Sequence, residues 1–417
     1  MKTFTSFLNE DAQGKNLHLE HLEDEILNFG IGGARGSVNF LRSLRDMMAG
    51  NSRTSINMTV KWDGAPAIFA GIDPSDGKFF VAKKSVFNKT PLLYKTAAEI
   101  ESDSRLPASL KPKFKVALSE FSKLGITNVL QGDLMFTSSD LEKDRIDGES
   151  YTTFQPNTIV YAVPVGSFLE RKMRAAKIGV VWHTTYTGKS LESMKASFGA
   201  DIKGLKKPSS VWMDDATYKD ESGTATFTKT ETDAITAKLS EVGKQFNKID
   251  STQLAKFLRL QSTLSGKFAG AGIKTYSNSK VRVGEEIKNP AAHAKGYLAW
   301  VEEKFDKEKD KVKTDKAKKA IEDKKAETLR DLRKLIDLLE NVIIFQNLIV
   351  SAKMMIVSKL NKIKQLMSTF VRTATGFKVV NPEGYVAIDR PTGNAVKLVD
   401  RMEFSYNNFT AIKAWDR

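Results

Sequence analysis

The period of the hydrophobic pattern changes twice along the chain, and this change limits the folds open to it. Between about residues 55 and 190, apolar residues form short runs rich in β-branched and aromatic side chains, which is typical of strands. From about 228 to 370 they recur at helical spacing, and past Thr375 short strand-like runs return. We therefore expect an α+β fold in which a large helical insertion interrupts an antiparallel-sheet core.

This pattern predicts four consecutive segments, which are an N-terminal helical segment 1–54, the first part of the core 55–225, a helical insertion 226–372 and C-terminal core strands 373–417. In the first segment, the glycine-rich stretch Asn28–Gly36 is expected to be a flexible turn before a helix that starts at Ser37. In the insertion, the spacing predicts helices over Thr230–Phe246 and Gln253–Leu264, an irregular stretch over Gly266–Val283, and long helices from Pro290 onward.

Turn residues divide the strand-like parts. Thr59–Gly71 is interpreted as two strands joined by a tight Asp-Gly turn, and Thr137–Ser150 as a polar loop. Near the C-terminus, Phe377–Val380 and Tyr385–Asp389 flank an Asn-Pro-Glu-Gly turn, which predicts a hairpin. The returning strands are expected to complete the core sheet.

The composition limits partners and compartment. The chain of 417 residues has a formal net charge of +15 and no cysteine, so a polyanionic partner is favoured and Cys-ligated zinc is excluded. The most apolar stretch, Leu335–Val350, contains two carboxylates and is interpreted as a buried helix, with no membrane partner. Without a signal peptide or disulfides we expect a cytoplasmic protein.

The first strand-like run ends in Lys61, followed by Trp62, Asp63 and Gly64. A lysine at the end of a partly buried strand is costly to keep charged, and it is a good nucleophile once its amine is neutral. Lys-x-Asp-Gly is the nucleophile motif of covalent nucleotidyltransferases. The alternative is a strand without catalytic function, whose lysine precedes a turn by chance.

Three further elements follow in the order of that family. Gln131-Gly132-Asp133-Leu134 resembles its Gly-Glu element, Glu383-Gly384-Tyr385-Val386 its Glu-Gly-x-Val element, and Val396-Lys397-Leu398-Val399 its lysine strand. The chain thus resembles the superfamily of ATP-dependent DNA and RNA ligases and mRNA capping enzymes. The resemblance covers roughly residues 55–190 and 375–405, and it implies an antiparallel nucleotidyltransferase core of the ATP-grasp-like ligase type.

The resemblance also implies roles. Lys61 attacks the α-phosphorus of ATP, with Glu383 and Lys397 as further catalytic residues. Carboxylates of Asp133 and Glu383 orient hydrated Mg²⁺, an oxygen-seeking cation. The residues implied to bind the nucleotide are Asp63, Gly64, Lys83, Lys84, Asp133, Tyr161, Lys397 and Arg401. Tyr161 is expected to stack on the base, with Trp182 as its alternative, whereas His183 is interpreted as an ordinary strand histidine.

The sequence departs from the family at three places. Asp133 is one methylene shorter than the usual Glu, and Val399 stands where a second lysine is usual, with Arg401 as its substitute. The chain also ends soon after Lys397, so we expect no C-terminal OB domain. RNA ligases of the phage type share that feature, and the Lys61–Gly71 stretch resembles uncharacterised proteins of large tailed phages, which implies the host cytoplasm.

These observations lead to an ATP-dependent RNA-ligase-like enzyme, with RNA favoured over DNA as partner. Two alternatives stay open. One is guanylyl transfer to an RNA end, or nucleotidylylation of a protein. The other is a nucleic-acid-binding phage protein that keeps the fold without turnover, as the departures at Asp133 and Val399 permit. The sequence does not specify the oligomeric state.

Overall fold

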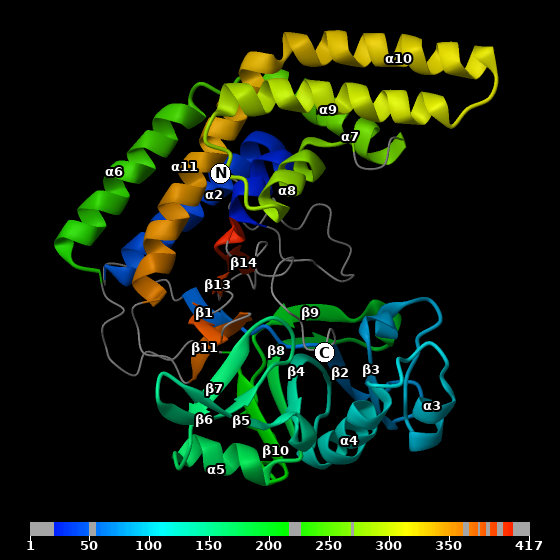
Figure 1. Cartoon of the computed structure of the whole chain (residues 1–417), viewed down its shortest axis with the longest axis vertical. Helices are drawn as coiled ribbons and strands as arrows, with labels where there is room; N and C mark the ends of the chain where they lie inside the picture. The colour runs from blue at the N-terminus through cyan, green and yellow to red at the C-terminus, as the bar shows by residue number, and fades with distance from the viewer. Residues whose placement is uncertain are drawn as a thin grey trace.

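The computed structural model describes residues 21–49, 56–216, 227–267, 271–361, 367–373, 376–380, 384–389 and 395–402. It has a strand-rich half and a helical half, which lie at opposite ends of the molecule (Figure 1). A small three-stranded sheet lies between them. The protein is therefore a mixed α+β protein with mainly antiparallel sheets, as the sequence predicts.

A six-stranded sheet forms the larger part of the strand-rich half. Five of its strands follow the order β10-β8-β4-β2-β3, and β9 pairs with β8 as well. All neighbouring strands are antiparallel except β8 and β10, which are parallel. Its strands are β2 (Ala67–Ile72), β3 (Phe79–Ala82), β4 (Val129–Thr137), β8 (Ile178–Thr187), β9 (Lys195–Phe198) and β10 (Val211–Asp215). Helix α4 (Lys111–Phe121) packs on one face, where Phe121 meets the buried ring of Trp182. Helix α3 (Ala97–Ser102) precedes it.

A five-stranded antiparallel sheet, ordered β12-β11-β7-β6-β5, completes this half. Its strands are β5 (Glu142–Ile146), β6 (Glu149–Phe154), β7 (Val160–Pro164), β11 (Ser368–Thr373) and β12 (Gly376–Val379). The loop predicted over Thr137–Ser150 is wrong, because β5 and the start of β6 pair across Asp147 and Gly148, which both have positive φ. The sequence did not predict this hairpin because the residues of edge strand β5 are mostly charged. Helix α5 (Phe168–Ala175) follows β7.

The three-stranded antiparallel sheet joins distant parts of the chain in the order β1-β13-β14. Its strands are β1 (Ile56–Lys61), β13 (Gly384–Asp389) and β14 (Ala395–Leu398). Two predicted hairpins are therefore wrong: β1 and β2 lie in different sheets, and β12 pairs with β11 whereas β13 pairs with β1. The C-terminal strands do return to pair with strands from the first part of the chain.

Seven α-helices of the described chain build the helical half, namely α2 (Glu25–Met48), α6 (Lys229–Phe246), α7 (Ser251–Lys267), α8 (Ile273–Arg282), α9 (Pro290–Asp310), α10 (Asp315–Lys334) and α11 (Ile336–Asn361). The sequence predicted α6 and α7 but not α8. The glycine-rich Asn28–Gly36 turn is also wrong, because α2 runs through it with a kink at Phe29 and Gly30. Short 3₁₀ turns are η1 (Leu22–Asp24), η2 (Lys84–Phe87), η3 (Ser122–Leu124), η4 (Ser138–Asp140) and η5 (Leu191–Ser193).

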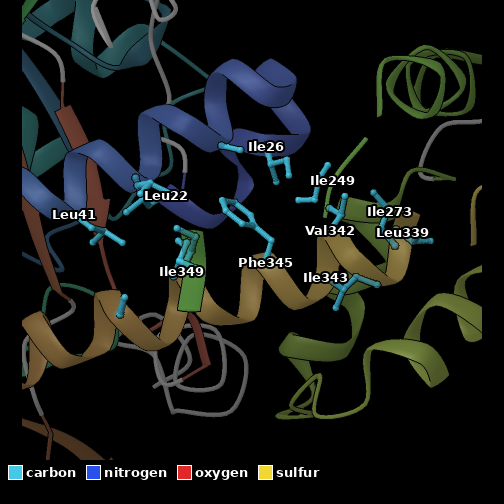
Figure 2. Packing of buried hydrophobic residues seen from close by; sticks show 14 of the residues in the cluster. Leu22, Ile26, Leu41, Ile249, Ile273, Leu339, Val342, Ile343, Phe345 and Ile349 are labelled. Atoms are coloured by element: carbon cyan, nitrogen blue, oxygen red, sulfur yellow. The ribbon is translucent and has the colours of Figure 1, made fainter. Parts of the chain in front are cut away.

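Helix α11 is the centre of the helical core. Its residues Phe345 and Ile349 lie toward Leu22 of η1 and Ile26 of α2, and all four belong to one buried cluster (Figure 2). By length and composition α11 is the one helix of the described chain apolar enough to cross a membrane, yet it packs against other helices on several sides. This confirms the buried helix that the sequence predicts over Leu335–Val350, and the structure is compatible with a soluble protein.

Candidate nucleotide site

The segment after Lys61 carries the chain from the three-stranded sheet to the six-stranded sheet. Its backbone is fixed on β4, because the Ala65 N–H donates to the Leu134 carbonyl at 3.1 Å and the Leu134 N–H donates to the Pro66 carbonyl at 3.1 Å. Trp62 stacks on Tyr161 with ring centroids 5.2 Å apart. The Lys61–Gly64 motif thus lies where two sheets meet.

Asp63 is an internal anchor of this motif. Its carboxylate accepts hydrogen bonds from Asn157 Nδ2 at 2.7 Å, from the Thr158 N–H at 2.7 Å and from the Ile159 N–H at 2.8 Å, and only 5% of the residue is exposed. The sequence predicted a contact with the nucleotide. The structure instead places this carboxylate against the segment before β7, where it holds the turn after Lys61.

The register of the three-stranded sheet places Lys61 and Lys397 on one face. Lys61 pairs with Gly384, and Val386 pairs with Lys397. Paired residues share a face and so do residues two apart in one strand, so all four face the same side. The two lysines flank β13, roughly 10 Å apart across the strands. Lysine side chains are long enough for two residues in this register to act on one ligand above β13.

The opposite face of this sheet is buried in the helical core. Tyr385, Ala387 and Leu398 belong to the cluster centred on α11, and the Tyr385 hydroxyl donates to Asn361 Oδ1 at 2.8 Å. The helical half therefore supports the strands from behind, while Lys61 and Lys397 face away from it.

Glu383 lies outside the described residues. Gly384, its neighbour, begins β13 with φ +141°, and a Cβ at this position would lie 2.7 Å from the Leu398 carbonyl oxygen and 2.8 Å from Val399 Cγ2. Only glycine fits this close crossing of β13 and β14. The structure thus explains why the Glu-Gly-x-Val element has a glycine at position 384.

Asp133 lies directly beside the lysine motif. A Cβ on Gly64 would be 2.4 Å from Asp133 Cβ, so the motif glycine allows the turn to touch β4 here. Within the described chain the Asp133 carboxylate accepts no hydrogen bond, and its ionic neighbour is His183 Nε2 at 3.8 Å. This carboxylate, in contrast to that of Asp63, remains available to a ligand. The described residues contain no cluster of three or more metal-ligating side chains.

The predicted base-stacking residues lie in the core. Tyr161 is 3% exposed and stacks on Phe154 as well as on Trp62, and its hydroxyl accepts the Asp63 N–H at 2.7 Å. Trp182 is fully buried against Phe121. The stacking role predicted for Tyr161 is therefore not supported, because neither ring has a face open to a base.

The remaining predicted residues separate into two groups. Lys83 is half-buried and Lys84 exposed, and both follow β3 near the start of β2, at the same end of the sheet as Asp133. Arg401 is more distant from that end, because its guanidinium pairs with Asp24 at 3.2 Å and also binds Asn278. Val399 is buried. Arg401 thus does not replace the second lysine of the family on this face.

His183, interpreted from the sequence as an ordinary strand histidine, lies beside Asp133 in the structure. It is the extra residue in a bulge of β8, because Gln131 pairs with Thr184 and Gly132 with Trp182. Its Nδ1 lies 2.8 Å from Thr184 Oγ1 and its Nε2 faces Asp133. The sequence indicated only that His183 lies in a strand. The alternation of side chains along a strand does not show a bulge or the neighbouring strand, so it could not place His183 beside Asp133.

A buried ionic cluster behind β14 was also missed. Lys353 of α11 is fully buried and pairs with Glu23 at 2.8 Å, and His21 Nδ1 lies 3.9 Å from the other oxygen of Glu23. The backbone of His21 also forms an isolated parallel β-bridge with that of Lys397 in β14. Burial alone would raise the pKa of Glu23, but Lys353 overcomes it and holds the pKa at about 2. Burial lowers the pKa of His21 to about 3, and the nearby cations act in the same direction. This cluster connects the N-terminal segment, α11 and the strand of Lys397.

The model of a protein family matches residues 16–413, which include both halves. It is DUF6267, a family of unknown function. The chain belongs to DUF6267. No curated protein and no solved structure matches it. The geometry of this DUF6267 chain is therefore the basis for assigning a function.

Proposed function

We propose that this protein is an ATP-dependent, RNA-ligase-like nucleotidyltransferase that works through a lysyl-AMP intermediate on Lys61. The observation that carries the proposal is the convergence of separate motifs. The register places Lys61 and Lys397 on one face of a sheet, and Gly64 brings the lysine turn against Asp133. Motifs more than 300 residues apart in sequence thus meet at one place.

The chemistry follows from these positions. In the first step the Lys61 amine attacks the α-phosphorus of ATP, an N–P bond forms, the P–O bond to the β-phosphate breaks, and pyrophosphate leaves as the amine loses a proton. Lys397, across β13, stabilises the negative charge that develops on the α-phosphate oxygens. In the second step a 5′-phosphate oxygen takes the AMP from Lys61. In the third, a 3′-hydroxyl attacks that phosphate and AMP is released.

Asp133 suits the metal that such a reaction uses. A carboxylate without a hydrogen-bond donor from the described chain, beside the lysine turn, is the kind of group that binds Mg²⁺ together with water and phosphate oxygens. Mg²⁺ would neutralise phosphate charge as pyrophosphate leaves. Glu383 remains its proposed second carboxylate.

Incubation with labelled ATP or GTP, followed by denaturing electrophoresis, tests the proposal. We expect label from ATP on the wild-type chain and none on Lys61→Arg, which keeps the charge but lacks a free neutral amine. Transfer to a 5′-phosphorylated RNA should then deplete the labelled protein. Label from GTP alone would instead support guanylyl transfer.

A second candidate is a nucleic-acid-binding protein that keeps this fold without turnover. The burial of Tyr161 and Val399 favours it, because these positions lack the open stacking face and the second cation of the related enzymes. Under this candidate, neither nucleotide labels the protein, while RNA binding persists and weakens steeply with salt.

A further inference from the structure

A cavity of about 580 Å³ lies in the helical half, separate from the lysine turn. Its wall is formed by the start of α2, by α8 and the segment after it, by α11, and by the residues that follow β14. The volume falls within the range of small-molecule sites. Arg401 contributes to the wall only four residues after Lys397, so the cavity is connected through β14 to the proposed nucleotide site.

Hydrogen-bond acceptors without donors line this cavity. Glu23 is 3% exposed, and one of its carboxylate oxygens binds Lys353. The other oxygen lies 3.9 Å from both Arg401 Nη1 and His21 Nδ1 and accepts no hydrogen bond within the described chain. Gln346 and Asn347 have their side-chain nitrogens tied to the wall, at the Glu23 and Ile287 carbonyls (3.0 and 2.9 Å). Their side-chain oxygens accept no hydrogen bond from the described residues. The cavity therefore favours a ligand that donates several hydrogen bonds.

The charges of the wall favour an uncharged ligand. The acidic side chains are Glu23, Asp24, Glu286 and Asp400, and the basic ones are Lys274, Lys288 and Arg401. Lys353 neutralises Glu23 from behind. With the two signs nearly balanced, neither a polyamine nor a free phosphate gains much from entering. Aliphatic side chains, among them Leu27, Ile287 and Val350, supply the apolar contacts that a flat ring needs.

We propose that this cavity binds one unstacked base of the nucleic-acid substrate, with a preference for bases that carry an exocyclic amino group. The proposal rests on the proposed function, because it takes the substrate class from there. Adenine, cytosine and guanine present amino donors at their edges, whereas uracil presents a single ring N–H. Single-stranded RNA is read in this way, by bases that are splayed out and hydrogen-bonded on their edges.

The test is nucleoside binding to the full chain carrying Lys61→Ala, measured by saturation-transfer NMR and calorimetry. Guanosine, adenosine, cytidine and uridine are the probes. We expect at least one amino-bearing nucleoside to bind at least tenfold more tightly than uridine. Binding should fall at least tenfold in Val350→Trp, which fills the cavity, and in Asn347→Leu, which removes an acceptor.

Val283→Trp is the matched control, because Val283 follows α8 but is 71% exposed. It should bind as the parent does. Absence of binding by every nucleoside overturns the proposal, as does binding that both cavity variants leave unchanged. Two variants are used so that misfolding of one of them, which thermal melts report, leaves the other to test the proposal. The result is separable from the proposed function, since Lys61 labelling with ATP succeeds or fails independently of nucleoside binding in this cavity.

Discussion

The two halves of the molecule bury their apolar residues differently. The helical half has one continuous core, which extends from α2 through α11 to Tyr385 and Leu398 of the three-stranded sheet. The strand-rich half has several smaller clusters, and its strands also carry half-buried polar residues such as Asp133 and His183. The helical half thus supports from behind the small sheet that carries Lys397, whereas the strand-rich half keeps the half-buried polar residues Asp133 and His183 near the lysine turn.

The largest effect on stability should come from the helical half, at Lys353. Replacing it by Ala removes the hydrogen-bonded cation of the buried Glu23 carboxylate and leaves only Arg401, 3.9 Å away, which costs about 3–5 kcal/mol of the free energy of unfolding. Urea denaturation measures this loss. The double variant Lys353→Met with Glu23→Gln should recover most of it. A loss below about 1 kcal/mol in Lys353→Ala would show that the ion pair does not support the sheet.

Lys397→Ala tests the face of the three-stranded sheet that points away from the helical half. We expect the rate of labelling by ATP to fall about 10²–10³-fold, as when one charge-stabilising group is removed from a transition state. Stability should change little, because Lys397 is only half-buried. Lys378→Ala, at an exposed lysine of β12, removes the same charge and should label normally. Equal rates in the two variants would contradict the role of Lys397.

Asp63 and Asp133, the two aspartates of the lysine turn and its neighbouring strand, should respond differently to replacement by Ala. Asp63→Ala leaves the Thr158 and Ile159 N–H groups without an acceptor and should cost about 2–4 kcal/mol in urea denaturation. Asp133→Ala should cost about 0.5 kcal/mol or less, yet abolish labelling by ATP. If Asp133→Ala proves the more destabilising of the two, the assignment of one anchor and one ligand-binding carboxylate is wrong.

Acid should destabilise the helical half through its buried histidines. Burial lowers the pKa of His293 to about 4 and that of His21 to about 3. Below pH 6.5 the unfolded chain takes up protons that the folded chain does not, so the free energy of unfolding falls by about 1–2 kcal/mol per histidine between pH 7 and 5. Glu23 adds to the loss between about pH 4.5 and 2, since its pKa is lowered to about 2.

Urea denaturation at pH 7 and at pH 5 measures this loss. His293→Asn is the informative variant, because it removes one of the titrating groups. Its stability should depend on pH less than that of the wild type, by about one proton. An unchanged dependence would mean that His293 is not kept neutral by the fold.

The sequence predicted the alternation of strand and helical segments and the return of the last strands, because hydrophobic period is a local property. It did not predict pairing partners. The Asp-Gly turn after Lys61 is typical of a hairpin, but the carboxylate of Asp63 is used by residues about 95 positions later, which no local pattern shows. Edge strand β5 and helix α8 were missed because their residues are largely charged or polar.

The candidate site was also predicted only in part, because local motifs do not show contacts between distant segments. Lys61, Gly64, Asp133 and Lys397 come from motifs, and the structure brings their strands and turns together. The roles of Tyr161 and Arg401 were inferred from the resemblance, and long-range packing gave both residues other partners. His183 and Lys353 acquire their importance only through contacts between distant segments, so single-sequence reasoning had no basis for choosing them.

The most direct test of the central claim is to locate the nucleotide on the protein. After incubation with ATP and Mg²⁺, the protein is digested and its peptides are examined by mass spectrometry. We predict AMP on the peptide that contains Lys61, on its side-chain nitrogen, and no AMP on the Lys61→Arg protein. AMP attached to a different residue, or an unmodified Lys61 peptide from protein shown to be folded, would contradict the account.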